Sequence, residues 1–121
     1  MAEKVTQVRV EEVESPAGVP ITVLRYTGDV TSASKAAVLG TYQGLAPGTK
    51  RILLDFSGVE YLNSSGIALV IQLMIAASKS GQVVQTFGLK PHFIKVFTMV
   101  GITKYTTLHP DEQTARAAFP A

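Results

Sequence analysis

The sequence contains no cysteine, which excludes disulfides and every thiolate metal site. That absence fits the reducing cytosol, where disulfides are rare. Histidine is scarce as well, because the chain has only His92 and His109, and they lack the helical spacing of paired zinc ligands. We therefore expect no metal and no cofactor, and we expect both histidines to be ordinary surface or loop residues.

Runs of one charge and long apolar runs are also missing. Eleven basic and nine acidic side chains are spread along the chain, so the basic stripe typical of a nucleic-acid binder is absent. The first residues hold no apolar signal core, and the longest apolar run, residues 67–77, is broken by Gln72. A membrane span needs about 20 apolar residues. We expect a cytoplasmic protein with no nucleic-acid partner and no direct membrane insertion.

What the chain does contain is enough apolar material for one core. Its 121 residues are 46% hydrophobic and 17% charged, which is typical of a globular protein and not of a disordered one. Domains most often run to about 100–150 residues. We expect a single domain over residues 1–121.

The first part of the chain has the pattern of a β-hairpin followed by a helix. Val5, Val8 and Val10 alternate with polar residues and predict a partly exposed strand. The Pro-Gly turn at 15–18 then leads to a second, antiparallel strand at 21–26. Residues 28–32 end that strand, and Thr31 or Ser32 is expected to cap a helix that reaches about Leu45.

The second part alternates strands with helices. Three consecutive apolar residues at 52–54 predict a central strand, residues 51–56, covered on both faces. After a loop, Asn63 is expected to cap a helix that reaches about Lys79, with Ser64 and Ser65 in its first turn. The further elements are a strand at 83–87, a helix at 91–100, a strand at 105–108 and a helix at 111–119. The order predicts an α/β fold with a mixed, mostly parallel central sheet, an N-terminal hairpin and about four helices.

The helix after Asn63 is apolar on more than one side. One face, suited to packing on a sheet, carries Ile67, Val70, Ile71, Met74 and Ile75. Leu69 and Leu73 add apolar surface elsewhere, which either a neighbouring helix or a partner protein has to cover. Burial by a neighbour is the favoured alternative.

Two segments superficially suggest catalysis. Residues 44–50 resemble a phosphate-binding loop, but the glycine spacing and the Thr-Lys order are wrong, so a helix-to-strand turn is the better interpretation. Ser64 or Ser65 at a strand-to-helix corner suggests a hydrolase, but that motif needs glycine two residues before the serine. Leu62 and Asn63 stand there instead. We expect no catalytic residue, and a serine hydrolase would require a histidine close to this corner.

Residues 52–67 resemble the signature segment of STAS domains. In that family a central strand ends near an Asp, and an Asp-Ser-Ser/Thr-Gly-Leu/Ile word opens the next helix; here the word is Asn63-Ser64-Ser65-Gly66-Ile67. Gly28-Asp29-Val30 is similar to the family's Gly-Glu-Leu, and residues 87–89 and 96–102 resemble its later strand and helix-to-strand junction. The resemblance covers nearly the whole chain.

The resemblance implies an anti-sigma factor antagonist that acts by partner switching. Such a protein binds an anti-sigma factor serine/threonine kinase and so controls sigma-factor-dependent transcription. The kinase phosphorylates the antagonist and releases it, and a serine phosphatase restores binding. By position, Ser64 matches the phosphorylated serine. The partner-binding residues expected from the match are Asp29, Val30, Thr31, Asn63, Ser64, Ser65 and Gly66.

Two positions depart from the family's usual residues. Asn63 stands where the family word has Asp, which keeps the size and the capping ability but removes the charge. Thr31 stands where many relatives carry Asp. The change at Asn63 favours an alternative in which the chain is a phosphorylation-independent STAS subunit of a signalling scaffold or a transporter complex.

Overall fold

A computed structural model, which describes residues 4–120, has one five-stranded mixed sheet with the strand order β1-β2-β3-β4-β5. The first two strands form the predicted antiparallel hairpin, and the remaining neighbours are parallel. The turn between them closes through a hydrogen bond from the Ser15 amide to the Val19 carbonyl, 2.9 Å. The strands are β1 (Gln7–Glu14), β2 (Pro20–Val30), β3 (Arg51–Leu62), β4 (Val83–Phe87) and β5 (Thr106–His109).

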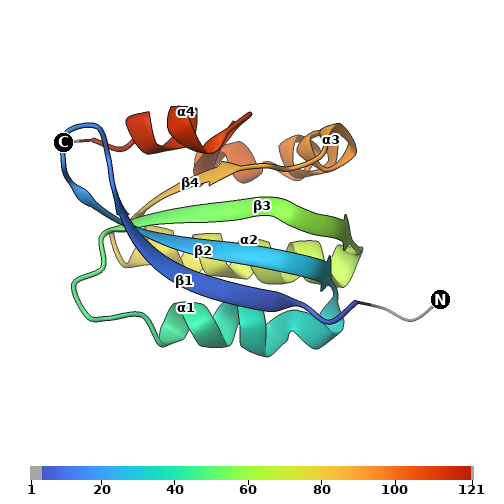
Figure 1. Ribbon diagram of the computed structural model, residues 1–121. Coiled ribbons are helices and arrows are strands. Elements are labelled where there is room, and N and C mark those ends of the chain that lie inside the picture. Colours follow the sequence, from blue (N-terminus) through green and yellow to red (C-terminus); the bar gives the residue numbers. More distant parts are fainter. Residues whose placement is uncertain (1–3, 121) are drawn as a thin grey trace.

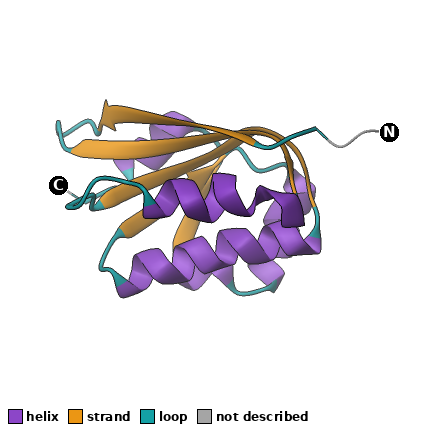
Figure 2. Cartoon of the chain, turned by 90° about the horizontal axis from the view of Figure 1, so that it is seen from below, coloured by secondary structure: helices purple, strands orange, loops and turns teal. Residues whose placement is uncertain are grey.

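Helices cover both faces of this sheet. Figures 1 and 2 show the helical segment after β2 lying beside α2 on one face, and Figure 1 shows α4 on the opposite face. This arrangement confirms the predicted α/β fold. The helical elements are η1 (Ser32–Ser34), η2 (Ala36–Gly40), α1 (Thr41–Gln43), α2 (Ser64–Lys79), α3 (Pro91–Met99), η3 (Ile102–Lys104) and α4 (Glu112–Ala117).

Three predicted elements were wrong in extent. β3 does not end at Phe56 before a loop but continues to Leu62, because β2 also continues and pairs with it through two irregularities in register. Gly58, which looks like a loop residue in the sequence, lies against Thr27 of β2, where a Cβ would be 2.7 Å from the Thr27 methyl group. The predicted helix from Thr31 to about Leu45 is a 3₁₀ turn, a π-helical turn and a short α-helix that ends at Gln43.

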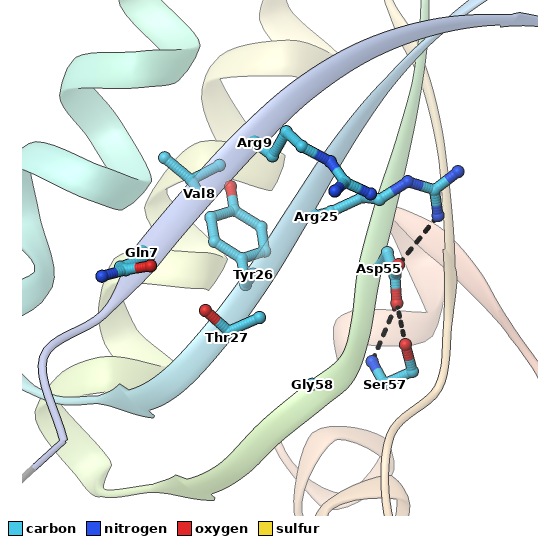
Figure 3. A pocket seen from close by; sticks show the side chains of 9 residues that line it. All are labelled: Gln7, Val8, Arg9, Arg25, Tyr26, Thr27, Asp55, Ser57 and Gly58. Carbon is cyan, nitrogen blue, oxygen red and sulfur yellow. Dashed lines mark hydrogen bonds and ion pairs between the residues drawn. The ribbon is translucent and has the colours of Figure 1, made fainter.

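The face that α4 covers has a small apolar cluster and a polar network beside it. The Arg25 guanidinium bonds Asp55 at 2.9 Å and Glu112 of α4 at 2.7 Å, and Asp55 in turn accepts from the Ser57 amide and hydroxyl. Figure 3 shows Arg25, Asp55 and Ser57 of this network, with Arg9 next to Arg25, along an open hollow of about 380 Å³. The apolar cluster comprises Ile21, Val23, Leu53, Phe87, Ala115 and Phe119.

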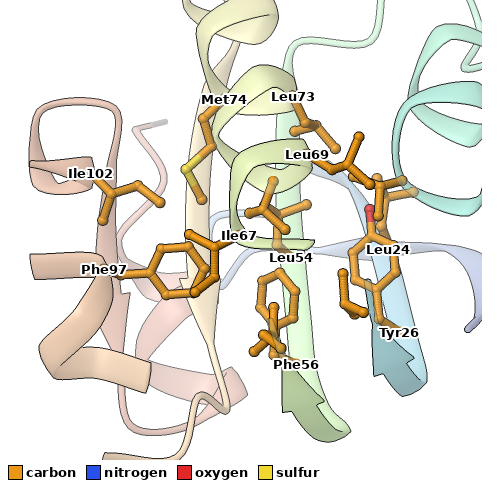
Figure 4. Packing of buried hydrophobic residues seen from close by; sticks show 14 of the residues in the cluster. Leu24, Tyr26, Leu54, Phe56, Ile67, Leu69, Leu73, Met74, Phe97 and Ile102 are labelled. Atoms are coloured by element: carbon orange, nitrogen blue, oxygen red, sulfur yellow. The ribbon is translucent and has the colours of Figure 1, made fainter. Parts of the chain in front are cut away.

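The main core lies on the opposite face. Ile52 and Leu54 point into it whereas Leu53 points into the smaller cluster, and all three are fully buried, which confirms that β3 is covered on both faces. Figure 4 shows Phe97, Ile67 and Phe56 in this core, where the Phe56 and Phe97 ring centroids lie 6.5 Å apart. Burying such aliphatic and aromatic side chains contributes about 1.5–3 kcal/mol each.

The buried face of α2 is rotated from the predicted one. Leu69 and Leu73 are buried, packed in the same cluster as Val38 of η2, so a neighbouring helical segment covers them as favoured. Ile71 and Ile75 are only partly buried. α2 therefore has no exposed strip of leucines beside Ser64 for a partner to bind.

Candidate functional site

The candidate site lies where β2 and β3 end side by side. Val30 and Leu62, the last residues of the two strands, are paired in the parallel register. Figure 1 shows that η1 and α2 begin at this same edge of the sheet. Because carboxyl ends of parallel strands meet at one edge, the segments 29–31 and 63–66 come together although they are distant in sequence.

Gly66 makes this meeting possible. It is buried against the end of β2, where an added Cβ would overlap the Val30 carbonyl oxygen and lie 2.5 Å from the carbonyl carbon. The Thr31 amide would be 3.0 Å away. The Asn63 amide also donates to the Val30 carbonyl, 3.2 Å. A glycine at position 66 is therefore required for the first turn of α2 to pack on β2.

Asn63 caps α2, as predicted. Its backbone is extended, and its side-chain Oδ1 accepts from the Gly66 amide at 2.8 Å. Its carbonyl accepts the Ile67 amide at 2.9 Å and so begins the helical hydrogen bonds. The cap satisfies one of the amides that a helix leaves unpaired at its N-terminus. Ser64 and Ser65 consequently occupy the first turn, at the positive end of the helix dipole.

The seven predicted site residues divide by exposure. Ser64 and Ser65 are exposed, and Asn63 and Asp29 are partly exposed. The other three, Val30, Thr31 and Gly66, are buried. The buried residues shape the corner, whereas the two serine side chains are accessible at its surface.

Thr31 has a local role in this corner. Its hydroxyl accepts from the Ala33 amide at 3.2 Å, and its amide donates to the Ser34 hydroxyl at 2.8 Å. This reciprocal capping fixes the start of η1. The Thr31 side chain is therefore a structural cap at the end of β2.

A charged cluster that no sequence pattern predicted borders the corner. The Lys4 amide donates to the Asp29 carboxylate at 3.1 Å, and the Asp29 amide donates to the Lys4 carbonyl at 3.0 Å. The Lys4 ammonium group bonds the Glu60 carboxylate at 2.9 Å. Lys90 reaches the Glu60 carbonyl from another direction, 3.4 Å away. The Lys4 hydrogen bond lowers the pKa of Glu60 and raises the pKa of Lys4. Next to this cluster, Tyr61 is 52% exposed.

Neither histidine forms a hydrogen bond with the two serines, within residues 4–120. His109 on β5 contacts Gln85 of β4, 2.8 Å, and burial lowers its pKa. His92 packs edge-on against Phe93 of α3. The same part of the chain has no cluster of metal-binding side chains and no helix long and apolar enough to cross a membrane. Neither histidine therefore makes the hydrogen bond that would activate Ser64 or Ser65 as a nucleophile.

A family model described as "Mlab, STAS domain" matches residues 19–110, which is most of the chain. The chain belongs to the STAS family. No curated protein matches it. STAS domains are generally regulatory domains without enzymatic activity.

Solved structures with the STAS fold come from different functional settings. An anti-sigma factor antagonist from Mycobacterium paratuberculosis has a TM-score of 0.75 at 17% identity, covering 97% of this chain and 96% of that one. The Bacillus cell fate determinant SpoIIAA in its phosphorylated form has a TM-score of 0.61 at 20% identity, covering 89% and 96%. A sulfate transporter family protein from Wolinella succinogenes has a TM-score of 0.66 at 14% identity, covering 80% and 84%. At these identities the likeness establishes the fold.

Proposed function

We propose that this STAS domain is an anti-sigma factor antagonist that binds an anti-sigma factor serine/threonine kinase and is phosphorylated on Ser64. Phosphorylation releases the kinase, and a serine phosphatase restores binding. The domain is then a kinase substrate and a regulator of sigma-factor-dependent transcription in the cytoplasm. The observation that carries the proposal is the exposed Ser64 hydroxyl at the corner that Asn63 and Gly66 hold against the end of β2.

At this corner the exposed side chain is not one of the groups that hold the fold together, as a modification site requires. Ser64 is exposed and makes no side-chain hydrogen bond with any described residue, so a kinase can reach it without unfolding the domain. The groups that fix the corner are the Asn63 side chain and the Gly66 backbone. Phosphorylation of Ser64 leaves both of those contacts in place.

The charge change is large in relation to its surroundings. A phosphoserine carries about −1.5 to −2 charges at neutral pH. Within its own chain, that charge lies at the positive end of α2, where the amides of the first turn favour an anion. Against a docked kinase, the same phosphate has to be desolvated in the contact. Phosphorylation therefore weakens the complex while the fold stays intact.

Phosphorylation by the host's candidate anti-sigma serine kinases, with ATP, tests the assignment. Intact mass and peptide mapping should show one phosphate, on Ser64, and Ser64→Ala should abolish it. Ser65→Ala, a matched change at the other exposed serine of this turn, should still be modified. Modification of Ser65 in place of Ser64 would overturn the assignment.

A second candidate is a phosphorylation-independent subunit of a signalling scaffold or a transporter complex. Two observations favour it: Asn63 removes the acidic residue that usually precedes the serine, and one structural relative is a sulfate transporter family protein. A kinase that binds the domain without modifying it would support this candidate, as would a transporter subunit that binds wild type and Ser64→Asp equally.

A further inference from the structure

Strand β1 is one edge of the sheet, and its outer side is unpaired. It pairs only with β2, and no other described segment forms a backbone hydrogen bond with residues 7–14. An unpaired edge is a template for another strand. At eight residues, β1 is longer than the mean strand of about 5–6 residues. The sequence along this edge then determines which strand fits.

A second copy of β1 can pair with it antiparallel, related by a two-fold axis perpendicular to the sheet. This symmetry keeps the two faces of the sheet separate, so one residue lies on the axis and opposes its own copy. Residues equally far on either side of the axis then oppose one another. Like charges directly opposite destabilise a strand pair, and opposite charges stabilise it.

Among the axis positions near the middle of β1, residues 9–12, only one avoids setting like charges directly opposite each other. An axis at Arg9 sets two arginines face to face, and an axis at Glu11 or Glu12 sets two glutamates face to face. An axis at Val10 pairs valine with valine. It also sets Arg9 opposite Glu11 of the second copy, twice by symmetry, and Glu12 opposite Val8.

The side chains of β1 are disposed for this register. Val10 is 46% exposed, and Arg9 makes no ion pair with any described residue although it is exposed. Glu11 is 40% exposed and bonds Arg25 through Oε2 at 2.5 Å, and its Oε1 makes no hydrogen bond within residues 4–120. A second guanidinium at Oε1 would complete a row of alternating charges, Arg25–Glu11–Arg9, across the two copies. Figure 3 shows Arg9 on the same face as Arg25.

We propose that this chain forms a two-fold dimer through β1, centred on Val10, which joins the two sheets into one. The dimer is independent of the proposed role of Ser64, because the site lies at the carboxyl ends of β2 and β3 and not on the β1 edge. Standard interfaces bury at least about 1,200 Å² of accessible surface, and the pairing of two such strands buries less. The association is therefore weak and depends on protein concentration.

Cysteine crosslinking tests the register, because the chain has no cysteine of its own. In the proposed dimer the two copies of Val10 are directly opposite, at a Cα separation of about 4.5–5.5 Å, within disulfide range. The two copies of Glu12 are four residues further apart along the strands, about 13 Å. Val10→Cys should give a covalent dimer under mild oxidation at least tenfold faster than Glu12→Cys. Equal rates, or a faster Glu12→Cys, would overturn the register.

Sedimentation velocity over a range of concentrations tests the dimer without a crosslink. The wild type should shift towards a dimer as concentration rises. Val10→Lys sets two ammonium groups together on the axis and should leave only monomer. Val100→Lys, the same change at a valine 54% exposed and outside β1, should behave like wild type. A wild type that stays monomeric, or a Val10→Lys variant that still dimerises, would contradict the proposal.

Discussion

Gly66 packs against the Val30 carbonyl so closely that a methyl group at position 66 would overlap the carbonyl oxygen. This contact joins the start of α2 to the end of β2 and so brings the Asp29–Thr31 segment beside Ser64. The position of the candidate phosphorylation site depends on this single close approach. Substitutions at this corner should therefore change the stability of the domain, which can be measured separately from partner binding.

Gly66→Ala should destabilise the domain by about 1–3 kcal/mol, because the new methyl group has to displace the β2 backbone. Urea unfolding measures the change. Gly40→Ala is the matched control, since the same methyl group there meets nothing closer than 4.0 Å. That change should be neutral or should stabilise the helical segment by up to about 1 kcal/mol. Equal effects of the two substitutions would show that the close approach is unimportant.

Asn63→Ala removes the cap of α2 and should cost about 0.5–2 kcal/mol of unfolding free energy. Asn63→Asp should keep wild-type stability, because a carboxylate oxygen can accept the Gly66 amide as the amide oxygen does. Thermal unfolding of both variants measures the difference. If Asn63→Asp is as unstable as Asn63→Ala, the Asn63 side chain does more than cap the helix.

Tyr26→Phe should leave stability unchanged or raise it by about 1 kcal/mol. The Tyr26 ring is 1% exposed and stacks on Phe56 at 5.3 Å, but its hydroxyl has no hydrogen-bond partner among the described residues. Burial away from water also raises the pKa of this phenol. A buried hydroxyl without a partner costs about 1–3 kcal/mol. Chemical unfolding of Tyr26→Phe checks this, and a loss of stability would mean that the hydroxyl is satisfied.

The Glu112 contact with Arg25 predicts a specific acid sensitivity. The hydrogen bond from Arg25 lowers the pKa of Glu112 below its ordinary value of 4.5. Since the folded pKa is the lower one, the stabilisation is complete above about pH 4.5 and is lost as pH falls through the folded pKa. Between pH 6 and pH 3, the free energy of unfolding of Glu112→Gln should therefore fall by less than that of the wild type.

Glu60→Gln is the control for this measurement. The pKa of Glu60 is also lowered, by Lys4, but that ion pair is exposed and solvent screens it. Its substitution should change the acid dependence little. If Glu60→Gln had the larger effect, the Arg25 network would not be the main source of acid sensitivity.

Local patterns in the sequence predicted the fold and the helix cap. Contacts between residues far apart in the sequence could not be predicted from such patterns. The apolar run at Ile52–Leu54 identified the central strand because burial on both faces removes alternation. Asn63 was identifiable because capping depends on residues three apart. The extension of β3 to Leu62 could not be identified, because the contact of Gly58 with Thr27 exists only in the sheet.

The same distinction applies to the candidate site. The match to the STAS signature located Ser64, and the structure then divided the predicted residues into exposed and buried ones. Lys4 and Glu60 were missed because residues so far apart in sequence meet only through the β1–β2–β3 order. No periodicity or motif marks such a pair.

The central claim is that Ser64 controls binding while the fold stays intact. The most direct test is to measure the affinity of the cognate kinase for the unmodified chain and for the chain carrying phosphoserine at position 64, together with the melting temperature of each. We predict at least tenfold weaker binding of the phosphorylated chain, with its melting temperature unchanged. Equal affinities, or a phosphorylated chain that is unfolded, would contradict the account.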